Sequence, residues 1–216
     1  MIARPPLIRE EVYSYLRDQL IQGQLEPSQT LRVQDLASEL EVSKTPIHDA
    51  LAQLVQEGLL ESLSRGFRVK RYGAREALNT YQVRMRIEGL SARLAAENIT
   101  TAGKKMLTRQ LKAIETCPPT DFTAHIEADL ELHNSLARLS ENDVLIDLTH
   151  SLTSRMLGFR VLTKDANSNL VTREQHEAIV AAVLQGDAEG AETAMNDHIR
   201  YFAELVSEML GEDYVS

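Results

Sequence analysis

The sequence has few cysteines and no long apolar run, and each shortage excludes a class of protein. Cys117 is the single cysteine, so no disulfide can form within the chain, which fits a reducing compartment. No run of roughly 18 or more apolar residues occurs, so neither a membrane span nor a membrane partner is expected. Residues 1–10 lack the apolar stretch of a secretory signal. We therefore expect a cytoplasmic protein.

Positive charge is also scarce, but it is unevenly distributed. The formal net charge is −9, although residues 1–72 hold nine Lys/Arg against ten Asp/Glu. Residues 73–216 hold fourteen against twenty-two. Four of these nine early cations lie within seven residues: Arg65, Arg68, Lys70 and Arg71. This asymmetry predicts two domains with different partners, one over residues 1–72 and one over residues 73–216.

Apolar spacing predicts three helices at the start of the first domain. The first covers residues 8–22, a second apolar pattern covers residues 31–42, and a third helix begins at Ser43 and ends near Gly58. Ser43 suits the N-cap position, and Pro46 is tolerated in a first helical turn. Two short helices joined by a tight turn predict a helix-turn-helix.

A β-hairpin is expected to follow the third helix. Residues 59–63 read as a strand, residues 64–66 as a turn, and residues 67–70 alternate apolar and basic side chains. The order of three helices and a hairpin is that of a winged helix. Glu41 lies at the turn where glycine usually takes a left-handed conformation, which costs about 1 kcal/mol for another residue.

The segment from Leu31 to Leu60 resembles the DNA-binding domain of the GntR family of bacterial transcription regulators. It contains L-A-x-x-L-x-V-S-K-T-P-I-x-x-A-L-x-x-L-x-x-E-G-L-L, and G-x-L-x-P precedes it at residues 23–27. The usual family pattern S-R-T-P-V-R-E-A-L is altered here at four positions: Lys44, Ile47, His48 and Asp49.

This resemblance implies double-stranded DNA as a partner, with the third helix in the major groove and the hairpin near the minor groove. The implied DNA-binding residues are Gln34, Ser43, Lys44, Thr45, His48, Arg65 and Gly66. Lys44 and His48 replace arginines and cannot make the bidentate guanine contact, so we expect altered base reading. Two alternatives stay open: His48 is merely exposed, or the whole winged helix serves protein contacts.

The second domain is predicted to be entirely helical. Apolar periodicity continues from residue 75 and is interrupted only at short polar or proline-containing breaks, without any β pattern. The protein is therefore expected to be mainly α, with an antiparallel bundle of about six helices after the winged helix. The expected helices cover residues 75–98, 101–115, 120–140, 142–163, 170–185 and 188–210.

A carboxylate and three imidazoles in this bundle predict a metal site. Asp129 and His133 are four residues apart and share one helical face. His176 and His198 are 22 residues apart, a spacing that lets two antiparallel helices bring both rings to one level. The alternative for Asp129 and His133 is a surface ion pair, but their neighbours are apolar. His125 is at best a neighbour of the site, and His150 has no partner at a suitable spacing.

The same four residues resemble the metal ligands of the FCD domain, found in the FadR-like branch of the GntR family. V-R-x-x-[IL]-E occurs at residues 83–88, A-A-E at 95–97, D-x-x-x-H at 129–133, H-x-x-[IL] at 176–179 and D-H at 197–198. Nitrogen and oxygen donors favour zinc, with nickel, manganese or iron(II) as alternatives. Open metal positions would accept a small organic acid, with Arg84 and Arg155 as candidate effector-binding residues.

Together these features predict a homodimeric transcription regulator that binds a palindromic operator and is not an enzyme. We expect a repressor controlled by a carboxylate effector at the metal. Two alternatives stay open: a regulator of the same family without metal, and a metal-dependent hydrolase with an accessory winged helix. The second is disfavoured because no general base stands at a suitable spacing, since Glu131 points away from Asp129 and His133.

Overall fold

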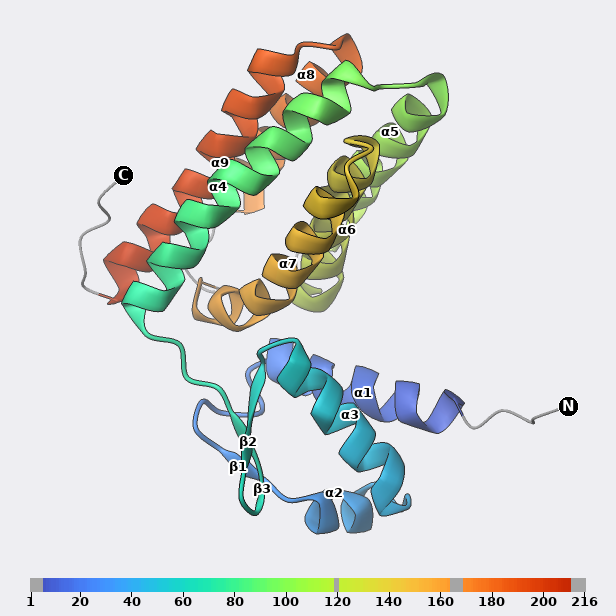
Figure 1. Ribbon diagram of the computed structural model, residues 1–216, viewed down its shortest axis with the longest axis vertical. Helices are drawn as coiled ribbons and strands as arrows, with labels where there is room; N and C mark the ends of the chain where they lie inside the picture. Colours follow the sequence, from blue (N-terminus) through green and yellow to red (C-terminus); the bar gives the residue numbers. More distant parts are fainter. Residues whose placement is uncertain (1–5, 119–120, 164–168, 211–216) are drawn as a thin grey trace, which may run out of the picture. The chain divides into compact units, whose positions relative to one another are not determined.

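Figure 1 shows the computed structural model, which describes residues 6–118, 121–163 and 169–210. The chain forms two compact units. One comprises Met1–Tyr72 with Ser154–Val161, and the other comprises Gly73–Thr153 with Leu162–Ser216. Within the described ranges no helix is both long and apolar enough to cross a membrane.

The first unit is a winged helix, as predicted. It contains α1 (Pro6–Ile21), β1 (Thr30–Leu31), α2 (Val33–Glu39), α3 (Lys44–Gln56), β2 (Leu60–Leu63) and β3 (Gly66–Val69). Helices α1 and α3 pack against each other because both bury their apolar faces. The side chains that form this core are less than 2% exposed: Leu16, Ile21, Ile47, Leu51 and Leu54.

The wing has one strand more than the predicted hairpin. Strands β2 and β3 pair antiparallel, and β1 pairs with the other edge of β3 to give the order β1-β3-β2. Gly66 begins β3 with φ of 100°, and a Cβ there would lie 2.7 Å from the carbonyl oxygen of Leu31. Glycine is therefore required where the wing turn meets β1.

Two local predictions in the helix-turn-helix can be compared with the structure. Glu41 has φ of 55°, which confirms the left-handed conformation expected in the turn. Ser43 occupies the N-cap position of α3, but its side chain makes no capping hydrogen bond. Its hydroxyl therefore lies at a helix N-terminus without being used by the helix itself.

The second unit is all helical. Together with the α7 segment Ser154–Val161, which is grouped with the first unit, its described residues form the six helices that the sequence predicts. They are α4 (Ala74–Glu97), α5 (Thr101–Thr116), α6 (Phe122–Leu139), α7 (Asp143–Thr163), α8 (Asn169–Gln185) and α9 (Ala188–Leu210). Polar side chains define several of the helix starts. Thr100 accepts a hydrogen bond from the Gly103 amide, and Asp121 accepts one from the Ala124 amide.

Helix α4 is the central element of this unit. It packs most extensively against α9, beside which it runs in Figure 1, and it also contacts α6 and α8. The inward positions of α4 are small or apolar near its C-terminal half, where Ala92, Ala95 and Ala96 are at most 2% exposed. They let α9 approach closely. The three helices that carry the predicted metal ligands therefore all pack on α4.

Candidate metal centre

The four predicted metal ligands come together in the interior of the helical unit. Asp129 and His133 lie on α6, His176 on α8 and His198 on α9, and each is at most 3% exposed. One potential ligand atom from each residue lies within 4.8 Å of the others. The His176 Nε2 atom is 2.9 Å from Asp129 Oδ1, and His133 Nε2 is 3.7 Å from Asp129 Oδ2.

Ordinary core packing brings these ligands together. Each of the four residues lies on the same face of its helix as buried apolar side chains. When that face packs into the core, the Asp or His side chain is buried with it. The buried neighbours are Ile126, Leu130, Leu132 and Leu136 on α6, Ile179, Val180 and Val183 on α8, and Met195, Ile199 and Phe202 on α9. The surface ion pair considered for Asp129 and His133 is excluded by this burial.

The donor atoms fit a transition metal. The Nε2 atoms of His133 and His198 are buried and form no hydrogen bond within the part of the chain that the structure describes. A buried nitrogen without a partner costs on the order of 1–3 kcal/mol, which coordination would offset. Three imidazoles and one carboxylate suit zinc, nickel, manganese or iron(II) better than calcium or magnesium.

Burial also keeps one imidazole in the form that binds metal. The interior location of His198 lowers its pKa well below the ordinary value of 6.5. The neighbouring His176 and His133 lower this pKa further, while Asp129 acts in the opposite direction. His198 is therefore neutral near pH 7, as a coordinating imidazole must be.

An ion pair from α4 lies against the site. Arg84 is 1% exposed, and its Nε and Nη2 atoms lie 2.5 and 3.1 Å from the two carboxylate oxygens of Glu88. Glu88 Oε2 also contacts Nδ1 of His133. Burial alone would raise the pKa of Glu88, but Arg84 and His133 outweigh it and lower that pKa to about 2. Glu88 is therefore ionised.

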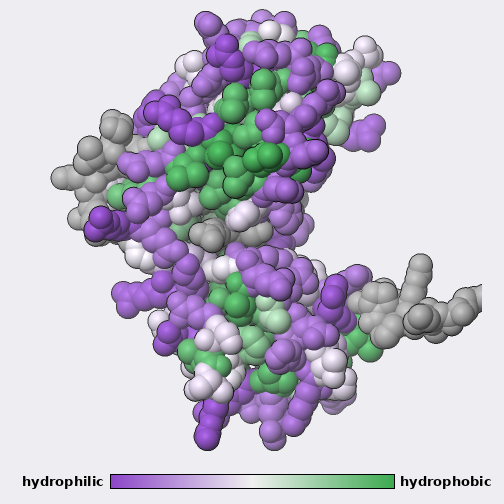
Figure 2. All heavy atoms as spheres, in the orientation of Figure 1, coloured by the Kyte–Doolittle hydropathy of each residue, from purple (hydrophilic) through white to green (hydrophobic). Residues whose placement is uncertain are grey.

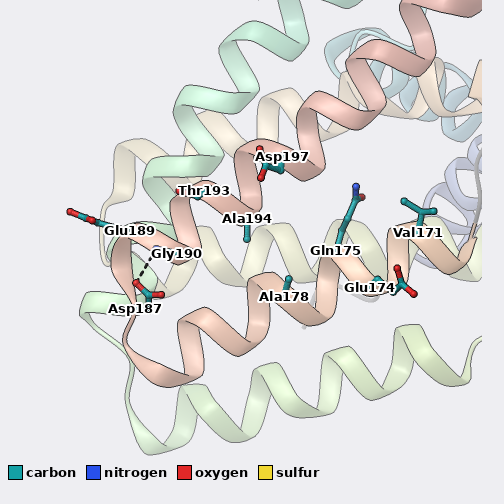
Figure 3. Close-up of a pocket in the computed structure, with 10 residues that line it drawn as sticks. All are labelled: Val171, Glu174, Gln175, Ala178, Asp187, Glu189, Gly190, Thr193, Ala194 and Asp197. Carbon is teal, nitrogen blue, oxygen red and sulfur yellow. Dashed lines mark hydrogen bonds between the residues drawn. The ribbon is translucent and has the colours of Figure 1, made fainter.

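A groove lies between α8 and α9, and none of the four predicted metal ligands lines it. Figure 3 shows Gln175 and several carboxylates along it, and its volume is about 700 Å³. Glu174, Asp187, Glu189 and Asp197 make this groove acidic, so it does not suit an anionic effector. Gln175 connects it to the interior, because its Oε1 atom is 3.1 Å from Nδ1 of His198.

The predicted DNA-binding residues lie on the surface of the winged helix. Ser43, Lys44, Thr45 and His48 are exposed on and before the first turns of α3, and so are Gln34 on α2 and Arg65 in the wing turn. The His48 ring meets the Phe67 ring of β3 edge to face, with centroids 5.7 Å apart. In the basic cluster, Arg68 is paired with Glu61 across the wing at 2.6 Å.

The sequence predicted the four residues that converge here, but two of their buried or polar neighbours, Glu88 and Gln175, were not predicted as part of the site. Glu88 is the last residue of the V-R-x-x-[IL]-E motif at residues 83–88. Its spacing of four from Arg84 could have indicated an ion pair on one face of the helix. Gln175 had no signal beyond being next to His176. The side chain of Arg155, the second candidate effector residue, lies outside the described residues.

The fold combines a winged helix with an all-helical domain that buries one carboxylate and three imidazoles at its centre. This is the architecture of a DNA-binding transcription regulator. The chain belongs to the GntR family of bacterial regulatory proteins, in the FadR-like branch that carries an FCD domain. The gntR family model matches residues 8–69, and the FCD domain model matches residues 79–201.

Proteins of similar sequence are also named as transcription regulators. The chain is 28% identical over 198 residues to a probable D-xylose utilization operon transcriptional repressor of Paenarthrobacter nicotinovorans, covering 89% of this chain and 88% of the relative. It is 25% identical over 213 residues to the HTH-type transcriptional repressor RspR of Escherichia coli K12, covering 95% and 92%. Both are named as repressors, in line with the prediction that the protein is not an enzyme.

Solved structures show the same fold. Escherichia coli McbR/YncC matches with a TM-score of 0.78 and 23% identity, over 96% of this chain and 99% of that one. A GntR regulator from Rhodococcus sp. RHA1 matches with a TM-score of 0.74 and 22% identity, over 94% and 97%. Both likenesses span the winged helix and the helical unit.

Proposed function

We propose that this regulator is a cytoplasmic repressor whose operator binding is controlled by a small carboxylate bound at a metal in the helical unit. Residues 1–72 would bind DNA, and residues 73–216 would bind the effector and form the dimer. The observation that carries the proposal is the burial of Asp129, His133, His176 and His198 around one point. Zinc is the metal we expect, ahead of nickel, manganese and iron.

Charge favours an anionic effector at this centre. A divalent ion brings two positive charges, of which Asp129 neutralises one. Arg84 and Glu88 cancel each other, so the remaining positive charge belongs to the metal. A carboxylate would complete the metal's coordination and balance that charge. We propose that Arg84, held beside the ligands, also contacts the effector, and Arg155 is proposed as a second contact.

The outward face of α4 supports a homodimer. Val83 and Leu90 are 51% and 39% exposed, and Ile87 and Leu94 between and beyond them are half-buried. Their spacing places all four on one stripe of the helix. Figure 2 shows hydrophobic residues gathered over α4 in the helical unit. A second copy covering this stripe would give two-fold symmetry, which suits a palindromic operator.

The DNA contact is tested most directly at Lys44. Lys44→Ala removes an exposed cation from the first turn of α3. Its loss is expected to weaken operator binding by about 1–3 kcal/mol and, for a phosphate contact, to reduce the salt slope by about 1. The measurement is fluorescence anisotropy with the protein's own promoter region at several salt concentrations.

Lys104→Ala is the matched control, because Lys104 is also exposed but lies on α5 of the helical unit. It is expected to leave operator affinity and salt slope unchanged. Equal affinity of Lys44→Ala and the original protein would contradict the proposed DNA surface.

The effector is tested by a panel of small hydroxy, keto and dicarboxylic acids added to zinc-loaded protein. At least one acid is expected to raise the unfolding temperature by several degrees and to weaken operator binding about tenfold, a coupling of about 1.4 kcal/mol. The His133→Ala/His176→Ala variant should lose both responses. An acid that acts equally on this variant and the original would show an effector pocket independent of metal.

A further inference from the structure

The feature behind this inference is a carboxylate from α4 that contacts a metal ligand on α6. Glu88 is 1% exposed and lies between Arg84 and His133. Its two oxygens are engaged by the Arg84 guanidinium, and Oε2 also contacts His133 Nδ1. Glu88 is not among the four residues whose ligand atoms converge on the metal centre.

The hydrogen-bonding chemistry of this trio fixes where the imidazole proton resides. An ionised carboxylate only accepts hydrogen bonds, and a guanidinium only donates them. The Nδ1 atom of His133, which contacts Glu88, must therefore be the donor and carry a proton. When this ring coordinates a metal, its lone pair is then on Nε2, the atom on the side of Asp129, 3.7 Å from Oδ2. This is the tautomer that a metal between α6, α8 and α9 requires.

We propose that Glu88 is a positioning residue that holds His133 as the Nδ1–H tautomer and directs its Nε2 atom to the metal, with Arg84 keeping Glu88 in place. The inference rests on the proposed metal site. A carboxylate behind a coordinating imidazole fixes the orientation of the ring and increases its basicity. Loss of such a partner typically weakens metal binding about 10- to 100-fold.

His198 provides an internal comparison. Its Nδ1 atom faces the side-chain amide of Gln175, with Oε1 at 3.1 Å. An amide can rotate to present either an acceptor or a donor, so it does not dictate the tautomer. Glu88 has no such freedom. Glu88→Gln would therefore give His133 the permissive partner that His198 already has, at nearly unchanged side-chain volume.

The first readout is zinc affinity, measured in the full-length protein by competition with a chromogenic chelator. Glu88→Gln is expected to weaken zinc binding about 10- to 100-fold. Glu97→Gln is the matched control, because Glu97 lies on the same helix and pairs with Arg93 at the surface, where it is 45% exposed. It should retain the original affinity. The Arg84→Met/Glu88→Met variant removes the whole ion pair and should show a similar loss while keeping the helical fold.

The second readout is the tautomer of His133 in metal-free protein, from nitrogen chemical shifts of the imidazole. We expect Nδ1–H in the original protein and in Glu97→Gln, and a mixture of tautomers in Glu88→Gln. If Glu88 served only to pair with Arg84 and stabilise the fold, Glu88→Gln would leave the imidazole nitrogen shifts of His133 unchanged. Zinc affinity within twofold of the original, or an unchanged tautomer in Glu88→Gln, would overturn the proposal.

These readouts separate the inference from the function it rests on. If the original protein binds no zinc, nickel, manganese or iron, the proposed metal site fails. The tautomer measurement then still decides whether Glu88 controls His133. If the original binds zinc and Glu88→Gln binds it more tightly, Glu88 competes with the metal and the positioning role is wrong.

Discussion

Arg84→Met is expected to lower the free energy of unfolding by about 3–5 kcal/mol. The guanidinium of Arg84 is the strong cationic partner of the buried Glu88 carboxylate, and both side chains are at most 2% exposed. Removing one member of such a pair leaves the other charge in the interior without compensation. The measurement is urea denaturation of metal-free protein, followed by the helical signal in circular dichroism.

Two further variants make this prediction specific. Arg86→Met has the same chemical change on the same helix but at an exposed position, and it should change stability by less than about 0.5 kcal/mol. Arg84→Met/Glu88→Met replaces both charges by apolar groups and should recover most of the loss. If Arg84→Met alone unfolds at the same urea concentration as the original, the ion pair does not stabilise the fold.

Zinc is expected to raise the stability of the protein by about 4 kcal/mol when its free concentration is 1,000 times the dissociation constant. For a chain of this size that corresponds to an increase of roughly 10 °C in unfolding temperature. The physical reason is that the ligands are gathered at one point only in the folded state, where each is at most 3% exposed. The measurement is thermal unfolding with and without buffered zinc.

The His133→Ala/His176→Ala variant should lose this increase, and metal analysis should find no bound zinc in it. His150→Ala is the control, because it removes an exposed imidazole from α7 and leaves the four ligands intact. It should keep the full increase. Equal metal content in the double variant and the original would show that the ion binds elsewhere.

Most of the fold could be predicted from the sequence because its helices are regular in apolar spacing and separated by clear breaks. The predicted and observed helices differ by at most three residues at their ends. The largest difference is in α2, which ends at Glu39 whereas the apolar pattern extends to residue 42. Strand β1 was missed because Thr30 and Leu31 are too short a segment to show a period of two. Its position depends on pairing with β3, a contact that local sequence does not encode.

The convergence of the ligands was predictable because α8 and α9 are antiparallel and joined by a short turn at Gly186 and Asp187. The contacts made by the residues around these four side chains were harder to predict. Arg84 was predicted to contact the effector, and its buried pairing with Glu88 through Nε and Nη2 was not anticipated. That outcome depends on which face of α4 is buried and on what α6 places opposite. Motif spacing does not contain this information.

Helix α4 has two faces with different roles in the proposed function. One face lies beside the site proposed to bind zinc, and the other is proposed to form the dimer. Arg84 and Glu88 face the ligands, while Val83 and Leu90 are exposed on the stripe proposed to contact a second copy. Coupling between two binding events is reciprocal in free energy. Any change in zinc affinity that accompanies dimer formation must therefore equal the change in dimer affinity that accompanies zinc binding. Only four residues separate Val69, where the last wing strand ends, from Ala74, where α4 begins, so this helix is also the covalent continuation of the DNA-binding unit.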